Sequence, residues 1–541
     1  MSTIGDLDLD ENRYSRQLML WGPLSQFYLK NASVCILGSC VVAIEVLISL
    51  AFNGIGNITI VDDSKIEQDD IGKSSILYNK AFINEYCVKV YVTEISKANV
   101  DTTLNFIIQS PERFLLELCE DSNRRDFYNV IVLCNIPQHI SSILFEYLRN
   151  TKKDYFIIVL TSVGFVGMVR IFMNGIHLSF DSDLSRQLSI RLKGLQLHQP
   201  LDELVNLSNE IEISDLDNLT HKHIPFPIIL MKAKQIYEGI YTSIYEENSS
   251  QILKQIIENK LCRFSNEINF QEAIQNINLL FSSDTSALYD ELNNILLESN
   301  KNVTFSYNRK LSLILHAINL FYKEYKRYPV CEKLPDMTSC TSLYLKLQSI
   351  YRDQFAKDID IIYTLLCTKY QDINQITKYE IKDLCDYLYT FVPVKYNNIY
   401  LSCDSNFNTL TFKNELMEYD SVENYKNQSL LAYYLILESR ELFNQKYGRY
   451  PKNSTEDLNE VINIIVAYLD KINLNIDIFC PNKDLIKQVI GFGTSQIQTT
   501  ACFIGAIASQ EIIKIITNKF VPLNNTLIWS GISCKCSAFK L

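Results

Sequence analysis

The stretch VCILGSCVVAIE, residues 34–45, constrains the fold of this chain more than any other segment. One apolar run ends at Gly38, and a second, long enough for a buried helix, begins at Val41. A strand, a tight glycine turn and a helix in this order are typical of the first unit of a nucleotide-binding α/β domain. The stretch therefore predicts a strand and a helix in a domain built around a parallel sheet.

The turn after Gly38 lacks the further glycines of a phosphate-binding loop. In such a loop, one glycine lets backbone N–H groups touch phosphate, and another lets the helix pack closely on the strand. Cys40, Val41 and Ala43 occupy the places where these glycines would serve. Because the β-branched side chain of Val41 would crowd a phosphate, we expect bulky side chains to fill the space that a triphosphate would need. A strand–helix turn without any ligand is the simplest interpretation.

The remaining apolar runs predict the rest of the α/β domain. Continuous apolar strands separated by helices favour a parallel sheet covered on both faces, and such runs occur at residues 58–61, 130–133, 156–160 and 526–529. Before the last of them, Ala501, Gly505 and Ala508 follow helical spacing. Small residues on one helix face let another backbone approach closely.

Residues 176–482 differ in character, because strand-like runs become rare and apolar residues recur at helical spacing. We expect three segments: residues 1–175 and 483–541 as the two parts of one α/β domain, and 176–482 as a large, mainly helical insertion. The fragments KRYP at 326–329 and GRYP at 448–451 resemble each other. Two occurrences are too few to predict a repeat protein.

Composition excludes several classes of function. The net charge is −11 and no block of Lys and Arg stands out, which argues against nucleic-acid binding. The apolar stretch 34–52 is interrupted by polar residues, so no membrane helix is expected. The acidic start is unlike a secretory signal, and the fifteen cysteines lack disulfide-framework spacing. We expect a reduced protein of the cytoplasm, with the nucleus also open.

No metal-ligand pattern or catalytic triad is evident. His221 and His223 flank a lysine with no cysteine close in sequence, which favours a loop over a metal site. The cysteines of the insertion that could serve as nucleophiles are Cys262, Cys331, Cys340, Cys367, Cys385 and Cys403. None stands in a sequence that suggests a catalytic thiol.

The segment RYSRQLMLWG, residues 13–22, precedes the turn at Gly38 that lacks the further glycines. It resembles the opening motif of the activating enzymes for ubiquitin and ubiquitin-like modifiers. Active members carry a loop of the form G-x-G-G-L-G-x-E, and only Gly38 and Glu45 of this chain match it. The resemblance implies a Rossmann-like adenylation-type domain split by a helical insertion like a catalytic-cysteine domain without its cysteine.

Three further departures from the active pattern concern the nucleotide and its metal. Asp62-Asp63-Ser64 stands in place of Asp-x-Asp, and Lys73 replaces an arginine that contacts the phosphates. Pro137 replaces an aspartate that helps hold magnesium. Since a pyrrolidine ring offers a hard cation no ligand, the resemblance implies that this chain binds neither nucleotide nor metal.

The chain resembles the non-catalytic, regulatory subunits of this family, in particular those of the neddylation pathway. The similarity spans nearly the whole chain and is strongest at ASQEIIKIITNKFVPLNNTLIWSGIS, residues 508–533. It implies a heterodimer whose catalytic subunit uses ATP and Mg²⁺ to adenylate a ubiquitin-like modifier, with the conjugating enzyme as a further partner. In the family, the arginine of the opening motif reaches the ATP in the partner's pocket, and here that residue is Arg16.

Two other functions remain open at this point. One is a self-sufficient homodimeric adenylyltransferase with a divergent loop, which would bind ATP by itself. The other is a scaffold that has lost the heterodimer role, which would be recovered without any related second chain.

Overall fold

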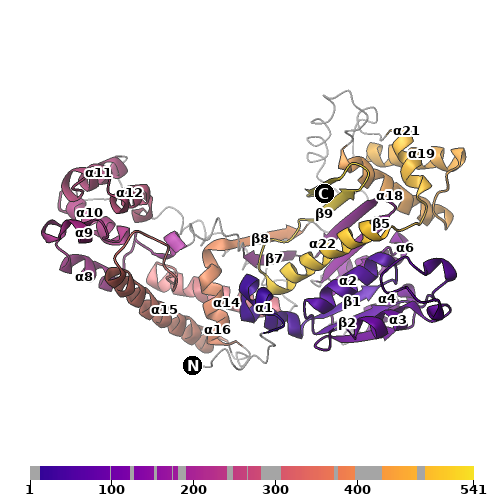
Figure 1. The fold of residues 1–541 in the computed structure, drawn as a ribbon, viewed down its shortest axis with the longest axis horizontal. Coiled ribbons are helices and arrows are strands. Elements are labelled where there is room, and N and C mark those ends of the chain that lie inside the picture. The colour runs from indigo at the N-terminus through magenta and orange to yellow at the C-terminus, as the bar shows by residue number, and fades with distance from the viewer. Residues whose placement is uncertain are drawn as a thin grey trace. The chain divides into compact units, whose positions relative to one another are not determined.

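The computed structural model describes residues 12–97, 99–121, 127–151, 155–173, 175–180, 191–240, 248–264, 266–281, 306–370, 376–396, 429–471 and 482–541. The chain divides into two compact units (Figure 1). The first, which we call the sheet unit, is Met1–Ser179 with Pro393–Leu541, and the second, the helical unit, is Phe180–Val392.

The sheet unit is built on eight strands in the order β10-β9-β6-β5-β4-β1-β2-β3. The five strands from β3 to β5 are parallel, and β6, β9 and β10 continue the sheet antiparallel. Strands β7 and β8 form a separate two-stranded sheet. The strands are β1 Ser33–Leu37, β2 Asn57–Val61, β3 Thr103–Ile107, β4 Val130–Cys134, β5 Phe156–Val163, β6 Val166–Phe172, β7 Gly175–Phe180, β8 Phe391–Tyr396, β9 Thr526–Ser530 and β10 Lys535–Phe539.

The described α-helices of the sheet unit cover this sheet. They are α1 Ser15–Asn31, α2 Val41–Phe52, α3 Cys87–Ile95, α4 Pro111–Glu120, α6 Gln138–Thr151, α18 Leu430–Tyr447, α19 Thr455–Lys471, α21 Lys483–Gly491 and α22 Gln498–Thr517. Strand β1 and helix α2 form where the apolar runs predict them, because both are buried along almost their whole length. The expected α/β fold class is confirmed, although the sheet is mixed and not purely parallel.

Helix α22 lies beside α2 and contacts β5 and β6 (Figure 1). The close approach expected from its small residues is confirmed, since a Cβ on Gly505 would lie 2.7 Å from the Cβ of Glu45. Ala501 and Ala508 are fully buried on the same helix. Among the described helices, α22 alone is long and apolar enough to span a membrane, but here much of it is buried in the core of the sheet unit.

The second domain boundary differs from the expected one. The first unit boundary falls after Ser179, near the expected 175, but the second falls at Pro393 rather than at residue 483. Helices α18, α19 and α21 gather beside β9 (Figure 1). Their buried side chains share one apolar core with residues of β6, β9 and β10, including Val166, Ile528 and Phe539. Burial against the sheet therefore joins these helices to the sheet unit.

Apart from the last residue of β7 and the first two of β8, the described part of the helical unit contains no strand. Its described α-helices are α8 Asp202–Glu210, α9 Asn218–His221, α10 Phe226–Ile240, α11 Ser249–Ile256, α12 Ile268–Gln275, α14 Ser306–Tyr325, α15 Thr341–Lys369 and α16 Lys378–Tyr387. The described residues between 180 and 392 are thus mainly helical.

The fragments KRYP and GRYP adopt the same structure. Each follows a helix and begins at a residue with positive φ, Lys326 in one case and Gly448 in the other. In the first, Arg327 donates to both carboxylate oxygens of Asp358, with two distances of 2.7 Å. In the second, Arg449 donates to both oxygens of Asp457 at 2.7 and 2.9 Å. The short sequence echo therefore encodes one recurring helix-termination motif, used once in each unit.

Candidate nucleotide-binding site

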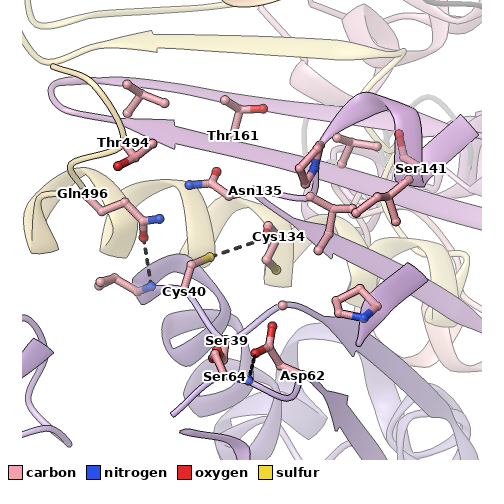
Figure 2. Close-up of a pocket in the computed structure, with 18 of the residues that line it drawn as sticks. Ser39, Cys40, Asp62, Ser64, Cys134, Asn135, Ser141, Thr161, Thr494 and Gln496 are labelled. Carbon is pink, nitrogen blue, oxygen red and sulfur yellow. Dashed lines mark hydrogen bonds between the residues drawn. The ribbon is translucent and has the colours of Figure 1, made fainter. Parts of the chain in front are cut away.

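A cavity of about 920 Å³ lies at the carboxyl ends of β1, β2 and β4 (Figure 2). In open α/β sheets this edge, where the strand order reverses, is where ligands bind. The cavity brings together the residues predicted at the former nucleotide and metal positions other than Ala43, namely Gly38, Cys40, Val41, Asp62, Lys73 and Pro137. Ala43 does not line it and is buried within α2. The expectation that bulky side chains fill this space is therefore not met.

Gly38 is required by the tight turn between β1 and α2. Its φ is +95°, and a Cβ there would lie 2.7 Å from the carbonyl oxygen of Cys134. The loop beyond it is held by side chains of the chain itself: the Tyr91 hydroxyl donates to the Ser39 carbonyl at 2.9 Å, and the hydroxyls of Ser39 and Ser64 lie 2.7 Å apart. Contacts within the chain therefore fix the conformation of this turn.

The N-terminus of α2, where a phosphate would bind, is occupied from within the chain. The Val41 N–H donates to Oε1 of Gln496 at 2.9 Å (Figure 2). Free N–H groups at a helix N-terminus are what make this position an anion site. Because Gln496 satisfies one of these donors, a phosphate here would have to displace a hydrogen bond already made. The cavity thus has room for a ligand, but one of the N–H groups that would bind a phosphate already has an acceptor.

The charged side chains at the mouth of the cavity also disfavour a triphosphate. Lys73, at the position of the family's phosphate-contacting arginine, pairs with Asp70 at 2.8 Å. Asp62 accepts from the backbone N–H of Ser64 at 2.7 Å. Asp62, Glu67 and Asp70 place three carboxylates in the lining beside Lys65 and Lys73, and carboxylates repel an anionic ligand unless a cation is bound. Pro137 supplies no ligand for such a cation.

The inner end of the cavity was not predicted from the sequence. It is lined by Arg170 of β6 and by Glu438, Arg440 and Glu441 of α18. Arg170 and Glu438 form an ion pair of 2.7 Å with exposures of 6% and 4%. Burial raises the pKa of Glu438 to about 7, against the opposing effect of Arg170. These residues lie far apart in the chain, so neither spacing nor motif could have indicated them.

Arg16 lies in the first turn of α1, which is kinked at Gly22. Its side chain is exposed, and no hydrogen bond or ion pair joins it to another described residue. Met19 and Leu20 follow it at helical spacing and are 88% and 65% exposed. Arg16 is therefore exposed beside two exposed apolar side chains. No described residue of the chain pairs with it.

Three of the candidate nucleophiles, Cys262, Cys331 and Cys385, lack the lowered pKa of an activated thiol. Burial raises the pKa of Cys262 to about 11 and that of Cys331 to about 12, and it raises the pKa of Cys385 as well. An activated thiol needs the opposite shift. Cys340 is half-buried and Cys367 is exposed, and neither faces a described cavity. Cys403 lies outside the described residues.

His221 has a structural environment. It ends helix α9, is fully buried, and its Nδ1 lies 2.9 Å from the carboxylate of Glu267, which also accepts from Cys262. His223 instead contacts the carbonyl oxygen of Leu219. The two imidazole rings therefore contact different groups. Cys262 lies near His221 in space, although it is distant in the sequence. Among the described residues, no group of three or more His, Cys, Asp and Glu is arranged to hold a metal ion.

Comparison with known proteins places these features in a family. The model of the ThiF family matches residues 14–540. The chain is 28% identical to the NEDD8-activating enzyme E1 regulatory subunit of Danio rerio, over 98% of both chains. It is 27% identical to the regulatory subunit AXL of Arabidopsis thaliana, over 98% of this chain and 99% of the relative. With the regulatory subunit of Saccharomyces cerevisiae the identity is 23%, over 98% and 100%.

Solved structures give a weaker likeness. The crystal structure of E. coli MccB with ATP is 21% identical, with a TM-score of 0.27, and the match covers 32% of this chain and 51% of that one. The family match spans the degenerate loop, the sheet and the helical unit alike. The chain belongs to the ThiF family.

Proposed function

We propose that this chain is the regulatory, non-catalytic subunit of a heterodimeric enzyme that activates the neddylation modifier. The similarity to named regulatory subunits over 98% of both chains carries this proposal. It favours the heterodimer over a self-sufficient homodimeric adenylyltransferase. The chain supports ATP-dependent adenylation of the modifier, and its transfer to a thioester, by a catalytic partner.

The nucleotide and metal chemistry belongs to the partner in this proposal. The cavity beside Gly38 fits ATP poorly, because the Val41 N–H is occupied, Lys73 is paired with Asp70, and Pro137 offers magnesium no ligand. ATP and Mg²⁺ would bind in the partner's pocket. The modifier and the conjugating enzyme would be shared partners of the assembled pair, which we place in the cytoplasm and the nucleus.

Arg16 is the residue of this chain that we assign to the partner's reaction. A guanidinium that reaches the phosphates would stabilise charge that develops on the departing pyrophosphate. Its exposure and lack of a described in-chain partner leave it available. Met19 and Leu20, exposed on the same helix, provide apolar area that contact with a second chain would bury. These three side chains are our candidate for the edge of the subunit contact.

Reconstitution tests the proposal directly. The full-length chain, a candidate catalytic subunit from the same organism and the modifier are mixed with Mg²⁺, ATP and labelled pyrophosphate, and exchange of the label into ATP is measured. We expect exchange with both chains present and none with either alone. Exchange supported by this chain and the modifier without the partner would contradict it.

A further inference from the structure

Two cysteines that are 94 residues apart in the sequence meet at the cavity. Cys40 precedes the first residue of α2, and Cys134 is the last residue of β4. The Cys40 thiol donates to the carbonyl oxygen of Cys134 at 3.6 Å (Figure 2). The two side chains are also close enough for each thiol to shift the pKa of the other. Both residues line the cavity, which gives a small reagent a path to them.

The surroundings of the two thiols differ in a way that gives them different reactivity. The Cys134 thiol, together with the backbone N–H groups of Ala43 and Val42, lowers the pKa of Cys40 against the effect of burial. A helix N-terminus stabilises a thiolate in this manner. Burial raises the pKa of Cys134 well above its ordinary value. Cys40 is therefore the nucleophile of the pair, and Cys134 keeps its proton.

Other thiols in the described part of the chain lack this combination. Burial raises the pKa of Cys502 to about 11, and it raises the pKa of Cys87, which lines the same cavity. Cys367 and Cys534 are exposed, but neither lines the cavity. Among the described cysteines, Cys40 alone lines the cavity, has a lowered pKa and contacts a second cysteine.

We propose that Cys40 and Cys134 are a redox-sensitive pair that a hydroperoxide converts to a disulfide. The Cys40 thiolate attacks one peroxide oxygen, the O–O bond breaks, and the departing oxide takes up a proton, which leaves Cys40 as a sulfenic acid. The Cys134 sulfur then attacks the Cys40 sulfur. The S–S bond forms, the S–O bond breaks, and the leaving hydroxide takes the Cys134 proton as water.

The disulfide would tie the end of β4 to the start of α2. These are the two segments that hold the Gly38 turn, since the Cys134 carbonyl packs against Gly38. Oxidation would therefore constrain the loop in which the Val41 N–H donates to Gln496. The pair does not depend on the regulatory-subunit assignment, and its test needs no second chain.

Peptide mass spectrometry tests the pair. The reduced full-length protein is treated with a few equivalents of hydrogen peroxide, blocked with N-ethylmaleimide under denaturing conditions, and digested. We expect the peptides that carry Cys40 and Cys134 to appear joined, with the mass of two hydrogens lost. Both cysteines remaining fully alkylated while exposed Cys367 is oxidised would overturn the proposal, as would a disulfide from Cys40 to any other cysteine.

Three variants assign the roles. In Cys134→Ala, Cys40 should stop at the sulfenic acid, which dimedone traps. In Cys40→Ser, which keeps a favourable helix N-cap, Cys134 should stay reduced. In Cys87→Ser, a change at the same cavity, the disulfide should form as in the parent protein. A Cys134→Ala protein that dimedone does not label at Cys40, with the native circular dichroism spectrum retained, would count against the mechanism.

Discussion

Replacing Arg16 with alanine should slow modifier adenylation by the assembled pair by about 10²-fold, because loss of one preorganised charge at a phosphoryl site typically costs that much or more. Heterodimer assembly should persist, since a single exposed side chain contributes little to a large interface. Single-turnover formation of the modifier adenylate, with the complex at saturating ATP, measures the effect on the chemical step.

Arg13 provides the matched control for this result. It lies three residues earlier but is engaged within the chain, at 3.4 Å from Asp101 and in a hydrogen bond with Asn99. Arg13→Ala should therefore leave the adenylation rate within about threefold of the parent, because it removes no charge from the partner's pocket. Equal rates for the parent and Arg16→Ala complexes would remove Arg16 from the partner's reaction.

Replacing Asp358 with alanine should destabilise the helical unit by about 3–5 kcal/mol, the usual cost of breaking a buried ion pair on one side. Asp358 is fully buried and accepts from Arg327, from the Val330 N–H at 3.2 Å and from Gln354 at 2.8 Å. Its removal leaves the Arg327 guanidinium, which is 11% exposed, without a charge partner. Hydrogen exchange of the α15 amides, with urea unfolding followed by circular dichroism, measures the loss.

The second copy of the motif supplies the comparison. Asp457 accepts the same pair of bonds from Arg449, but that arginine is 47% exposed. Water can replace a lost partner there, so Asp457→Ala should cost clearly less than Asp358→Ala. The opposite ranking would show that burial of the arginine does not set the energy of this motif.

Local apolar runs were enough to locate the central strands and helix α2. The run at Ser33–Leu37 and the run at Val41–Phe52 form β1 and α2, because both are buried along almost their whole length. Strand β3 escaped prediction since it is a mostly exposed edge strand with little apolar signal. Strand β6 escaped because it includes Arg170, whose charge is compensated only by Glu438 from a distant helix.

The sequence predicted where the site lies, but it did not predict the cavity or the hydrogen bonds within it. The glycine turn and the residues after the strands located the former nucleotide site at this edge of the sheet, but they predicted a filled site and not a cavity. The glutamine that occupies the Val41 N–H is 455 residues away in sequence, so no local pattern could reveal it. Similarly, Val41 looked large enough to fill the space, but most of its side chain is buried in the packing of α2, and the cavity persists.

The central claim is that this chain retains the shape of a nucleotide site but leaves nucleotide binding to a partner. Isothermal titration of ATP with Mg²⁺ into the lone full-length chain, and then into the chain assembled with its catalytic subunit, tests it most directly. We predict no saturable heat for the lone chain and one ATP per assembled pair. Stoichiometric ATP binding by the lone chain, lost on substitution of the residues around Gly38, would contradict the account.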